Sequence, residues 1–175
     1  VSFRTKRPVA TDILERLPAT FELVLCAMVV ATTFGVGFGV LASKFRDGVF
    51  DHVSRAFSLA GSSIPVFWSG LICLFIFSVK FHILPGPGRL DARTVPPEFV
   101  SGLFTVDALL AGDLAKFGEA VTHLILPSIV LGWAVMGIIS RLVRSSMLDV
   151  LSKDYIVMAR SKGATEMRVL LNHAL

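Results

Sequence analysis

The chain is poor in charged residues. Only 17% of its 175 residues are Asp, Glu, Lys or Arg, whereas 54% are hydrophobic and the mean hydropathy is +0.73. Soluble domains carry about 25% charged residues, so this composition indicates a membrane protein. A formal net charge of +4 would suggest nucleic-acid binding in a soluble domain, but here the basic residues flank apolar runs. We therefore expect membrane lipid, and no nucleic acid, among the partners.

The chain also lacks the short motifs of common nucleotide-binding, metal-binding and hydrolytic sites. It has no GxxxxGK[ST] sequence to cradle phosphate groups, so we expect it to bind neither ATP nor any other cofactor itself. HExxH, CxxC and GxSxG sequences are absent too. Its histidines are too scattered for a local metal site, and we expect them at interfaces or on the surface: His52, His82, His123 and His173. We predict that the chain is not an enzyme and has no catalytic or metal-binding residue.

No acidic residue or histidine lies deep inside an apolar run. A charge at the bilayer centre costs about 2.5–3.5 kcal/mol on insertion scales, so polar residues kept there usually have a function. Their absence argues against an intramembrane enzyme or a proton-coupled carrier. Glu22 lies at the end of a run, from which it can reach the interface. Cys26 and Cys73 lie in separate runs and are interpreted as small hydrophobic side chains.

Three apolar runs are long enough to cross a membrane, which takes about 20 helical residues. They predict spans at about 21–43, 56–79 and 121–141. Basic residues gather in the short segment between the first two spans and after the third, which places both on the cytoplasmic side. The segment 80–120 is rich in Pro and Gly and more acidic than basic, so we expect a solvated external loop. The predicted fold class is all-α, a polytopic transmembrane helical bundle.

Glycine and proline add detail to these spans. Gly35 and Gly39 form a GxxxG pair, which allows a neighbouring helix to approach closely. Pro18 is expected to end a helix before the first span. Pro127 lies near the start of the third predicted span, where the first turn tolerates proline.

The second predicted span is interrupted at Pro65. Because proline removes a backbone donor, we expect a kink there, with Ser62 or Ser63 satisfying the freed backbone groups. Two interpretations remain open. The three residues line a substrate path, or they form a structural kink packed against neighbouring helices.

The most informative segment is 145–170, after the third span. Four apolar residues at i, i+1, i+3 and i+4 predict a short amphipathic helix: Tyr155, Ile156, Met158 and Ala159. Gly163 is expected to end this helix in a left-handed conformation, and Thr165 to cap a second helix that begins at Glu166. A basic amphipathic helix on anionic lipid is the alternative interpretation.

The order of residues here resembles the cytoplasmic coupling loop of ABC importer permeases, in the binding-protein-dependent branch for dipeptides, oligopeptides and nickel. The similar stretches are 154–156, 159–164 and 168–175. Further similar stretches are 8–23, before the first span present here, and 58–68, in the second.

The general loop motif of this family is matched only in part. The motif begins Glu-Ala-Ala, followed by three residues and a Gly. Ala159 and Gly163 match its second alanine and its glycine, whereas Val157 and Met158 replace its glutamate and its first alanine. The resemblance therefore implies a docking role without a glutamate-specific contact. The residues that it implies for coupling to an ATPase are Asp154, Tyr155, Met158, Ala159, Arg160, Lys162 and Gly163.

The resemblance implies a partial permease domain over residues 1–175, a fragment without the first and the last two of six spans. It implies a multi-pass protein of a bacterial or archaeal inner membrane that imports peptides. The implied partners are a second homologous permease, an external substrate-binding protein and two ATPases, which carry ATP and Mg²⁺. Nickel or glutathione import by the same architecture is an alternative, and so is a non-transporting membrane scaffold or channel subunit.

Overall fold

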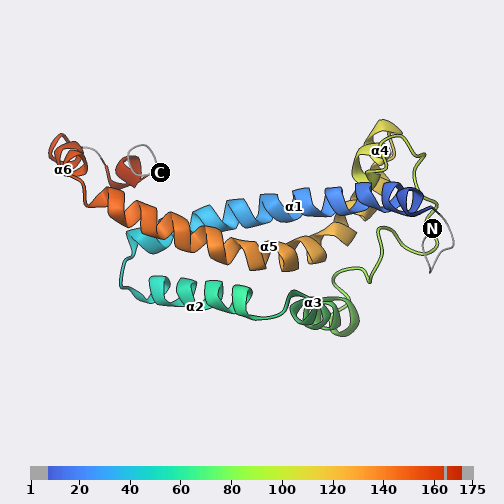
Figure 1. Cartoon of the computed structure of the whole chain (residues 1–175), viewed down its shortest axis with the longest axis horizontal. Coiled ribbons are helices and arrows are strands. Elements are labelled where there is room, and N and C mark those ends of the chain that lie inside the picture. Colours follow the sequence, from blue (N-terminus) through green and yellow to red (C-terminus); the bar gives the residue numbers. More distant parts are fainter. Residues whose placement is uncertain (1–7, 164, 171–175) are drawn as a thin grey trace. The chain divides into compact units, whose positions relative to one another are not determined.

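The structure is a computed structural model that describes residues 8–163 and 165–170 (Figure 1). Seven α-helices and one π-helical segment lie in these residues: α1 (Val9–Lys44), α2 (Val49–Ser63), α3 (Val66–Leu74), the π-helical segment Phe75–Lys80, α4 (Phe104–Leu110), α5 (Leu114–Leu151), α6 (Asp154–Ser161) and α7 (Glu166–Arg168). The described residues contain no strand, and the predicted all-α fold is confirmed. His173 and the last residues of the stretch 168–175 lie outside the described residues.

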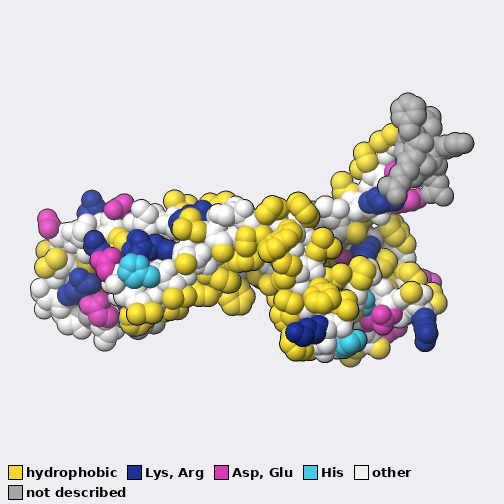
Figure 2. Space-filling view, turned by 90° about the horizontal axis from the view of Figure 1, so that it is seen from below, with side chains coloured by type: hydrophobic (Ala, Val, Ile, Leu, Met, Phe, Trp, Pro, Cys, Tyr) yellow, Lys and Arg dark blue, Asp and Glu magenta, His cyan; other side chains and the backbone are white. Residues whose placement is uncertain are grey.

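Two helices, α1 and α5, are long and apolar enough to cross a membrane. The helices α2 and α3 form a third candidate if this broken pair counts as one span, so the number of spans stays a prediction. Large hydrophobic side chains such as Val24, Leu25 and Val29 are exposed on α1, and Figure 2 shows hydrophobic side chains over much of the face that it displays. A helix that is apolar around its circumference is typical of a membrane span.

Two helix boundaries differ from those predicted. The helix α1 begins at Val9 and continues through Pro18, so the prediction that Pro18 ends a helix is wrong. One proline removes a single backbone donor, and the remaining hydrogen bonds of a long helix keep it intact. The helix α5 begins at Leu114, which puts Pro127 in its interior rather than in its first turn.

The chain divides into two compact units. The first comprises the residues up to Ala27 together with Phe67–Leu131, and the second comprises Met28–Val66 together with the residues from Gly132 onward. Both α1 and α5 contribute their earlier part to the first unit and their later part to the second.

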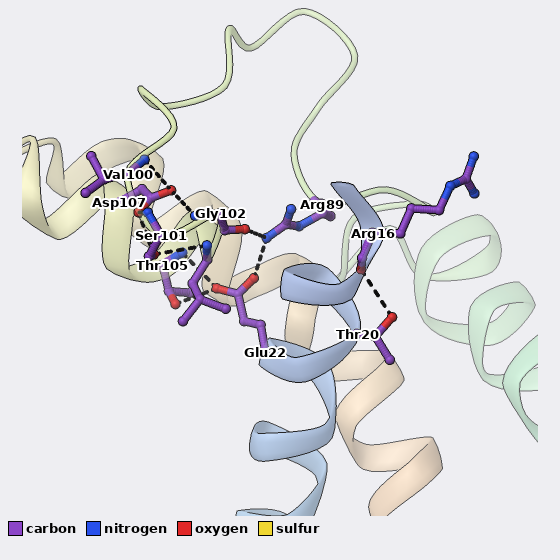
Figure 3. A network of polar contacts seen from close by, with 10 residues as sticks. Arg16, Thr20, Glu22, Arg89, Val100, Ser101, Gly102, Thr105 and Asp107 are labelled. Carbon is purple, nitrogen blue, oxygen red and sulfur yellow. Dashed lines mark hydrogen bonds and ion pairs between the residues drawn. The ribbon is translucent and has the colours of Figure 1, made fainter. Parts of the chain in front are cut away.

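In the first unit, the irregular segment 81–103 is held to α1 by a buried carboxylate (Figure 3). Glu22 accepts a hydrogen bond from Arg89 Nη2 at 2.7 Å through Oε2, and one from the backbone N–H of Thr105 at 2.8 Å through Oε1. Arg89 also donates to the carbonyl oxygen of Gly102 at 2.9 Å. Glu22 is therefore buried and paired within the protein, and its position relative to the membrane interface stays a prediction. The Glu22 carboxylate can be buried because Arg89, 67 residues later in the chain, supplies the hydrogen bond and the opposite charge that water would otherwise supply.

A second carboxylate, that of Asp107 in α4, organises the turn before its own helix. Asp107 accepts hydrogen bonds from the backbone N–H groups of Ser101 at 2.8 Å and Gly102 at 2.9 Å. Burial raises the pKa of Asp107, but these hydrogen bonds and that from the Ser101 hydroxyl outweigh burial, so the pKa lies below the ordinary 3.8. The stability that Asp107 contributes is therefore present above pH 3.8 and is lost as the pH falls through the lowered pKa of the folded state.

The segment 81–103 is also tied to α5. Glu119 accepts hydrogen bonds from the backbone N–H of Asp91 at 2.6 Å and from the Thr94 hydroxyl at 3.1 Å. One turn later, His123 is buried, with Nδ1 3.0 Å from the Glu119 carbonyl oxygen. The alternative of a surface position for His123 is wrong, because the ring is buried and finds its partner within its own helix; an interfacial position stays a prediction.

In the second unit, α1 packs closely on α5 through two of its three glycines. A Cβ atom at Gly35 would lie 2.9 Å from Cβ of Ile139, and one at Gly39 would lie 2.7 Å from Cβ of Val143. Real Cβ contacts are not that short, so both positions require glycine. The close approach predicted from the GxxxG pair is confirmed, and the partner helix is α5.

The helix α2 packs on the same part of α5 (Figure 1). Its buried residues are small or polar: Asp51, Ser54, Ser58 and Gly61. A Cβ atom at Gly61 would lie 2.8 Å from the carbonyl oxygen of Trp133, and one at Gly137 would overlap the carbonyl oxygen of Ser58. The indole of Trp133 stacks on Phe57, with 5.1 Å between ring centroids. The backbones of α2 and α5 are therefore in close contact at Gly61 and Gly137.

Candidate functional site

The predicted amphipathic helix is present as α6. It begins at Asp154, after Lys153 in an extended conformation. Ile156 is fully buried, whereas Tyr155 is 50% exposed and Met158 is 59% exposed. One apolar side chain therefore anchors α6, and two larger ones remain accessible to another molecule.

A sharp bend follows α6 at Gly163, as the sequence predicts. Gly163 has φ +84°, which L side chains rarely adopt, and its backbone N–H donates to the Arg160 carbonyl at 2.9 Å. Among the described residues, no neighbouring atom lies within 4 Å of a Cβ built at Gly163. Glycine is thus required by the backbone conformation and not by crowding. The helix α7 starts at Glu166 with Thr165 at its N-cap position, as predicted. The Thr165 side chain makes no capping hydrogen bond, so that part of the prediction is wrong.

An ion pair that the sequence analysis missed connects the two sides of this bend. Arg160 donates from Nε to Glu166 Oε1 at 2.9 Å and from Nη2 to Oε2 at 3.3 Å. Both side chains are largely exposed, so the pair contributes at most about 1 kcal/mol. Its parallel geometry nevertheless favours one angle between α6 and α7. The i, i+6 separation of opposite charges across a glycine is the signal that could have indicated it.

The other residues predicted for coupling also lie on or beside α6. Asp154 is exposed in the first turn, where a negative charge complements the helix dipole. Lys162 is exposed directly before the bend, and Ala159 is half-buried. The structure therefore brings all seven predicted residues together on one helix and its end.

The three residues predicted for a substrate path lie where α2 stops. The helix ends at Ser63, Ile64 is extended, and α3 begins after Pro65. The helix is thus broken rather than kinked, because Ile64 leaves the helical conformation before the proline. The hydroxyl of Ser62 lies within hydrogen-bonding distance of the Ser58 and Leu59 carbonyl oxygens. These carbonyls precede that of Gly61, which the missing N–H of Pro65 leaves free, so the expected role of Ser62 or Ser63 toward the freed groups stays a prediction. A path role for Ser62, Ser63 and Pro65 stays a prediction too.

A buried ion pair near the start of α2 was not predicted. Arg144 of α5 donates from Nε to Asp51 Oδ1 and from Nη2 to Oδ2, both at 2.6 Å. Asp51 is fully buried and also accepts the backbone N–H of Asp47 at 3.0 Å. Parallel bonds of this kind between guanidinium and carboxylate are the strongest ion pairs in proteins. The 3-4-3 spacing of small or polar residues from Asp51 to Gly61 is the signal that could have found this face.

These contacts place α6 at the end of a firmly packed group of helices. Only Ser152 and Lys153 separate α5 from α6, and α5 is joined to α2 by the ion pair of Asp51 and Arg144. The short connection and this ion pair link α6 to α5 and α5 to α2. No group of three or more potential metal-ligating side chains lies in the described part of the chain.

Comparison with known proteins agrees with this geometry. Residues 35–175 match the family described as "Binding-protein-dependent transport system inner membrane component". The chain belongs to this family. The predicted family and the predicted inner-membrane localisation are thereby confirmed.

Several transport permeases are similar to the whole chain. The di/tripeptide transport system permease protein of Pseudomonas aeruginosa (strain UCBPP-PA14) is 45% identical over 175 residues, which cover 99% of this chain and 52% of that protein. The dipeptide transport system permease protein of Escherichia coli (strain K12) is 40% identical over 177 residues, which cover 100% of this chain and 52% of that protein.

A probable D,D-dipeptide transport system permease protein of Escherichia coli (strain K12) is 41% identical over 174 residues, or 99% of this chain and 51% of that protein. The chain thus spans about half the length of these curated relatives. All three are named as transport permeases for peptides. They lend no support to the alternatives of nickel import, glutathione import or a non-transporting scaffold.

Proposed function

We propose that the complete protein is a permease subunit that imports dipeptides or oligopeptides across the inner membrane. The observation that carries this proposal is 40–45% identity, along essentially the whole chain, to relatives named for dipeptide and di/tripeptide transport. In the proposed assembly, an external binding protein delivers the peptide and a second homologous permease completes the pathway. Two ATPases hold ATP and Mg²⁺ and supply the energy.

The proposed mechanism assigns the transmission of movement to α6. Tyr155 and Met158 enter a groove on an ATPase, while the buried Ile156 holds α6 to its own unit. The neighbouring charges of Asp154, Arg160 and Lys162, together with Ala159, complete the contact surface. When the ATPases close on ATP, α6 moves as a rigid lever and α5 moves with it. The bend at Gly163 sets the angle of this lever.

The first prediction concerns the partners. The complete protein, expressed with an affinity tag in its native host and extracted gently, is expected to co-purify with two ATPases and an external binding protein. Mass spectrometry of the purified complex checks this, and the ligand of the binding protein identifies the substrate. Recovery of the chain alone, also after cross-linking, would contradict the proposal in favour of a scaffold.

The second prediction concerns the bend. Gly163→Val is expected to lower peptide uptake at least tenfold while ATP hydrolysis continues, because a β-branched residue disfavours φ +84° by about 1–2 kcal/mol or more. The measurement is the number of peptides transported per ATP hydrolysed in proteoliposomes of the complete transporter.

Gly112→Val is the matched control for this variant. Gly112 also has a positive φ, +69°, and its Cβ would meet no described atom within 4 Å, but it lies between α4 and α5, away from α6 in the chain. Gly112→Val is expected to transport as many peptides per ATP hydrolysed as the wild type. Normal coupling in Gly163→Val would refute the role assigned to the bend.

A further inference from the structure

A cavity in the first unit has both charges of the Glu22–Arg89 pair on its wall. Its volume is about 210 Å³, and the remaining lining is mostly apolar, including Phe104 and Pro127, with His123 as a further polar group. Replacing a buried ion pair by apolar residues is often neutral or stabilising. The Glu22–Arg89 pair holds the segment 81–103 to α1, and it also borders an empty space that a polar ligand can enter.

Arg89 is the member of this pair that a ligand can reach. Its side chain is 29% exposed, whereas that of Glu22 is 6% exposed. Both hydrogen bonds described for Arg89 use Nη2, to Glu22 and to Gly102, and a guanidinium has five N–H donors. Phe104 holds the plane of the group, with its ring centroid 3.5 Å from Cζ. Figure 3 shows the bond between Arg89 and Glu22. The other N–H donors of Arg89 can bind a carboxylate while this bond is kept.

A larger apolar cavity adjoins this site. Its volume is about 640 Å³, and four residues line both cavities: Leu23, Gly88, His123 and Pro127. Its other walls come from α3, including Gly70 and Leu74, and from the later part of α5 in this unit. A cationic group next to an apolar space is complementary to a small molecule that has a carboxylate and an apolar side chain.

We propose that Arg89 binds the terminal carboxylate of a short peptide and that the adjoining apolar cavity receives the peptide's last side chain. Glu22 also lines the smaller cavity and occupies Nη2 of Arg89, so the ligand carboxylate uses the remaining guanidinium donors and has to share Arg89 with Glu22. The inference rests on the proposed peptide function and adds to it a binding site in the permease itself. It also specifies the ligand chemistry, a free carboxylate beside an apolar residue.

The test is direct binding to the complete permease and ATPase complex in lipid nanodiscs, without the external binding protein. Radiolabelled alanyl-leucine is the probe, and equilibrium dialysis measures its affinity. Unlabelled alanyl-leucine is expected to compete at least tenfold better than its C-terminal amide, because charge-assisted hydrogen bonds to the carboxylate are lost in the amide. Competition by laurate, but not by the peptide, would assign the site to a fatty acid and overturn the proposal.

Two variants of the ion pair separate binding from structure. Arg89→Gln is expected to weaken alanyl-leucine binding at least tenfold and to abolish the preference over the amide. Glu22→Gln is expected to bind the peptide as tightly as the wild type or more tightly, because it removes the carboxylate that competes for Arg89. A purely structural clamp predicts equal losses in both variants. Equal losses, or no change in Arg89→Gln, would overturn the proposal.

A variant remote from the ion pair tests the apolar cavity. A Cβ atom at Gly70 lies 3.7 Å from Val130 Cγ1, an ordinary contact, so Gly70→Ala is accommodated whereas Gly70→Leu fills the cavity. Gly70→Leu is expected to weaken binding of alanyl-leucine at least tenfold and that of alanyl-glycine much less, with Gly70→Ala as the control. Equal effects on both peptides would contradict the assignment of the side-chain pocket.

Uptake through the binding protein is measured in parallel with the same wild-type complex. Transport of peptides without direct binding would refute the site but leave the proposed function standing. Failure to transport any peptide would refute the proposed function itself. The two failures are thereby distinguishable.

Discussion

Gly137→Leu is expected to prevent native packing of α2 on α5. Even the first side-chain atom at this position would overlap the carbonyl oxygen of Ser58, and that atom belongs to the backbone of α2 and cannot rotate away. Overpacking commonly costs about 1–3 kcal/mol and more where the backbone has to move, so we expect a cost of about 3 kcal/mol or more. The midpoint of thermal unfolding in detergent, followed by size-exclusion chromatography, measures it.

Gly118→Leu is the control in the same helix. A Cβ atom at Gly118 meets no described atom within 4 Å, so the same change of residue is expected to leave the unfolding temperature nearly unaltered. Gly137→Ala is expected to be destabilising too, because the overlap begins at Cβ. A Gly137→Leu protein with wild-type thermal stability would show that α2 does not approach α5 in this way.

Asp51→Ala is expected to destabilise the second unit by about 3–5 kcal/mol, because it leaves the guanidinium of Arg144 without its partner in a largely buried site. Arg144→Met is expected to cost less than Asp51→Ala, because Arg55 Nε still lies 3.5 Å from Asp51 Oδ1 and partly compensates the buried carboxylate. Combining the two changes removes both charges, so the double variant is expected to recover much of the loss. Thermal unfolding of the four proteins provides this double-mutant cycle.

Arg46→Ala is the control for an ion pair without burial. Arg46 and Asp47 lie 3.3 Å apart, but their side chains are 65% and 73% exposed, so the expected cost is below about 1 kcal/mol. Equal costs for Arg46→Ala and Asp51→Ala, or strictly additive costs in the cycle, would refute a strong coupling between α2 and α5. In transport assays, the Asp51→Ala protein is expected to lose peptide uptake together with its fold.

The amino-acid sequence by itself determined the features that depend on composition and on short spacing. The scarcity of charge and the apolar runs indicate an all-α membrane protein, and the apolar spacing around Tyr155 predicts α6. Gly163 predicts the bend because only glycine takes a positive φ without strain. The GxxxG pair predicts a close helix contact, although not the identity of the partner helix.

Only the tertiary structure decided which distant residues meet. Arg144 lies 93 residues from Asp51, and Arg89 lies 67 residues from Glu22. Neither pair follows from local spacing, since a carboxylate beside an apolar run looks the same in sequence whether water or a remote guanidinium satisfies it. The break at Ile64 could not be predicted from the local sequence either. A proline kinks or ends a helix according to the hydrogen bonds that its surroundings supply. Local chemistry thus specified the helices of this chain, and long-range packing specified its buried charges.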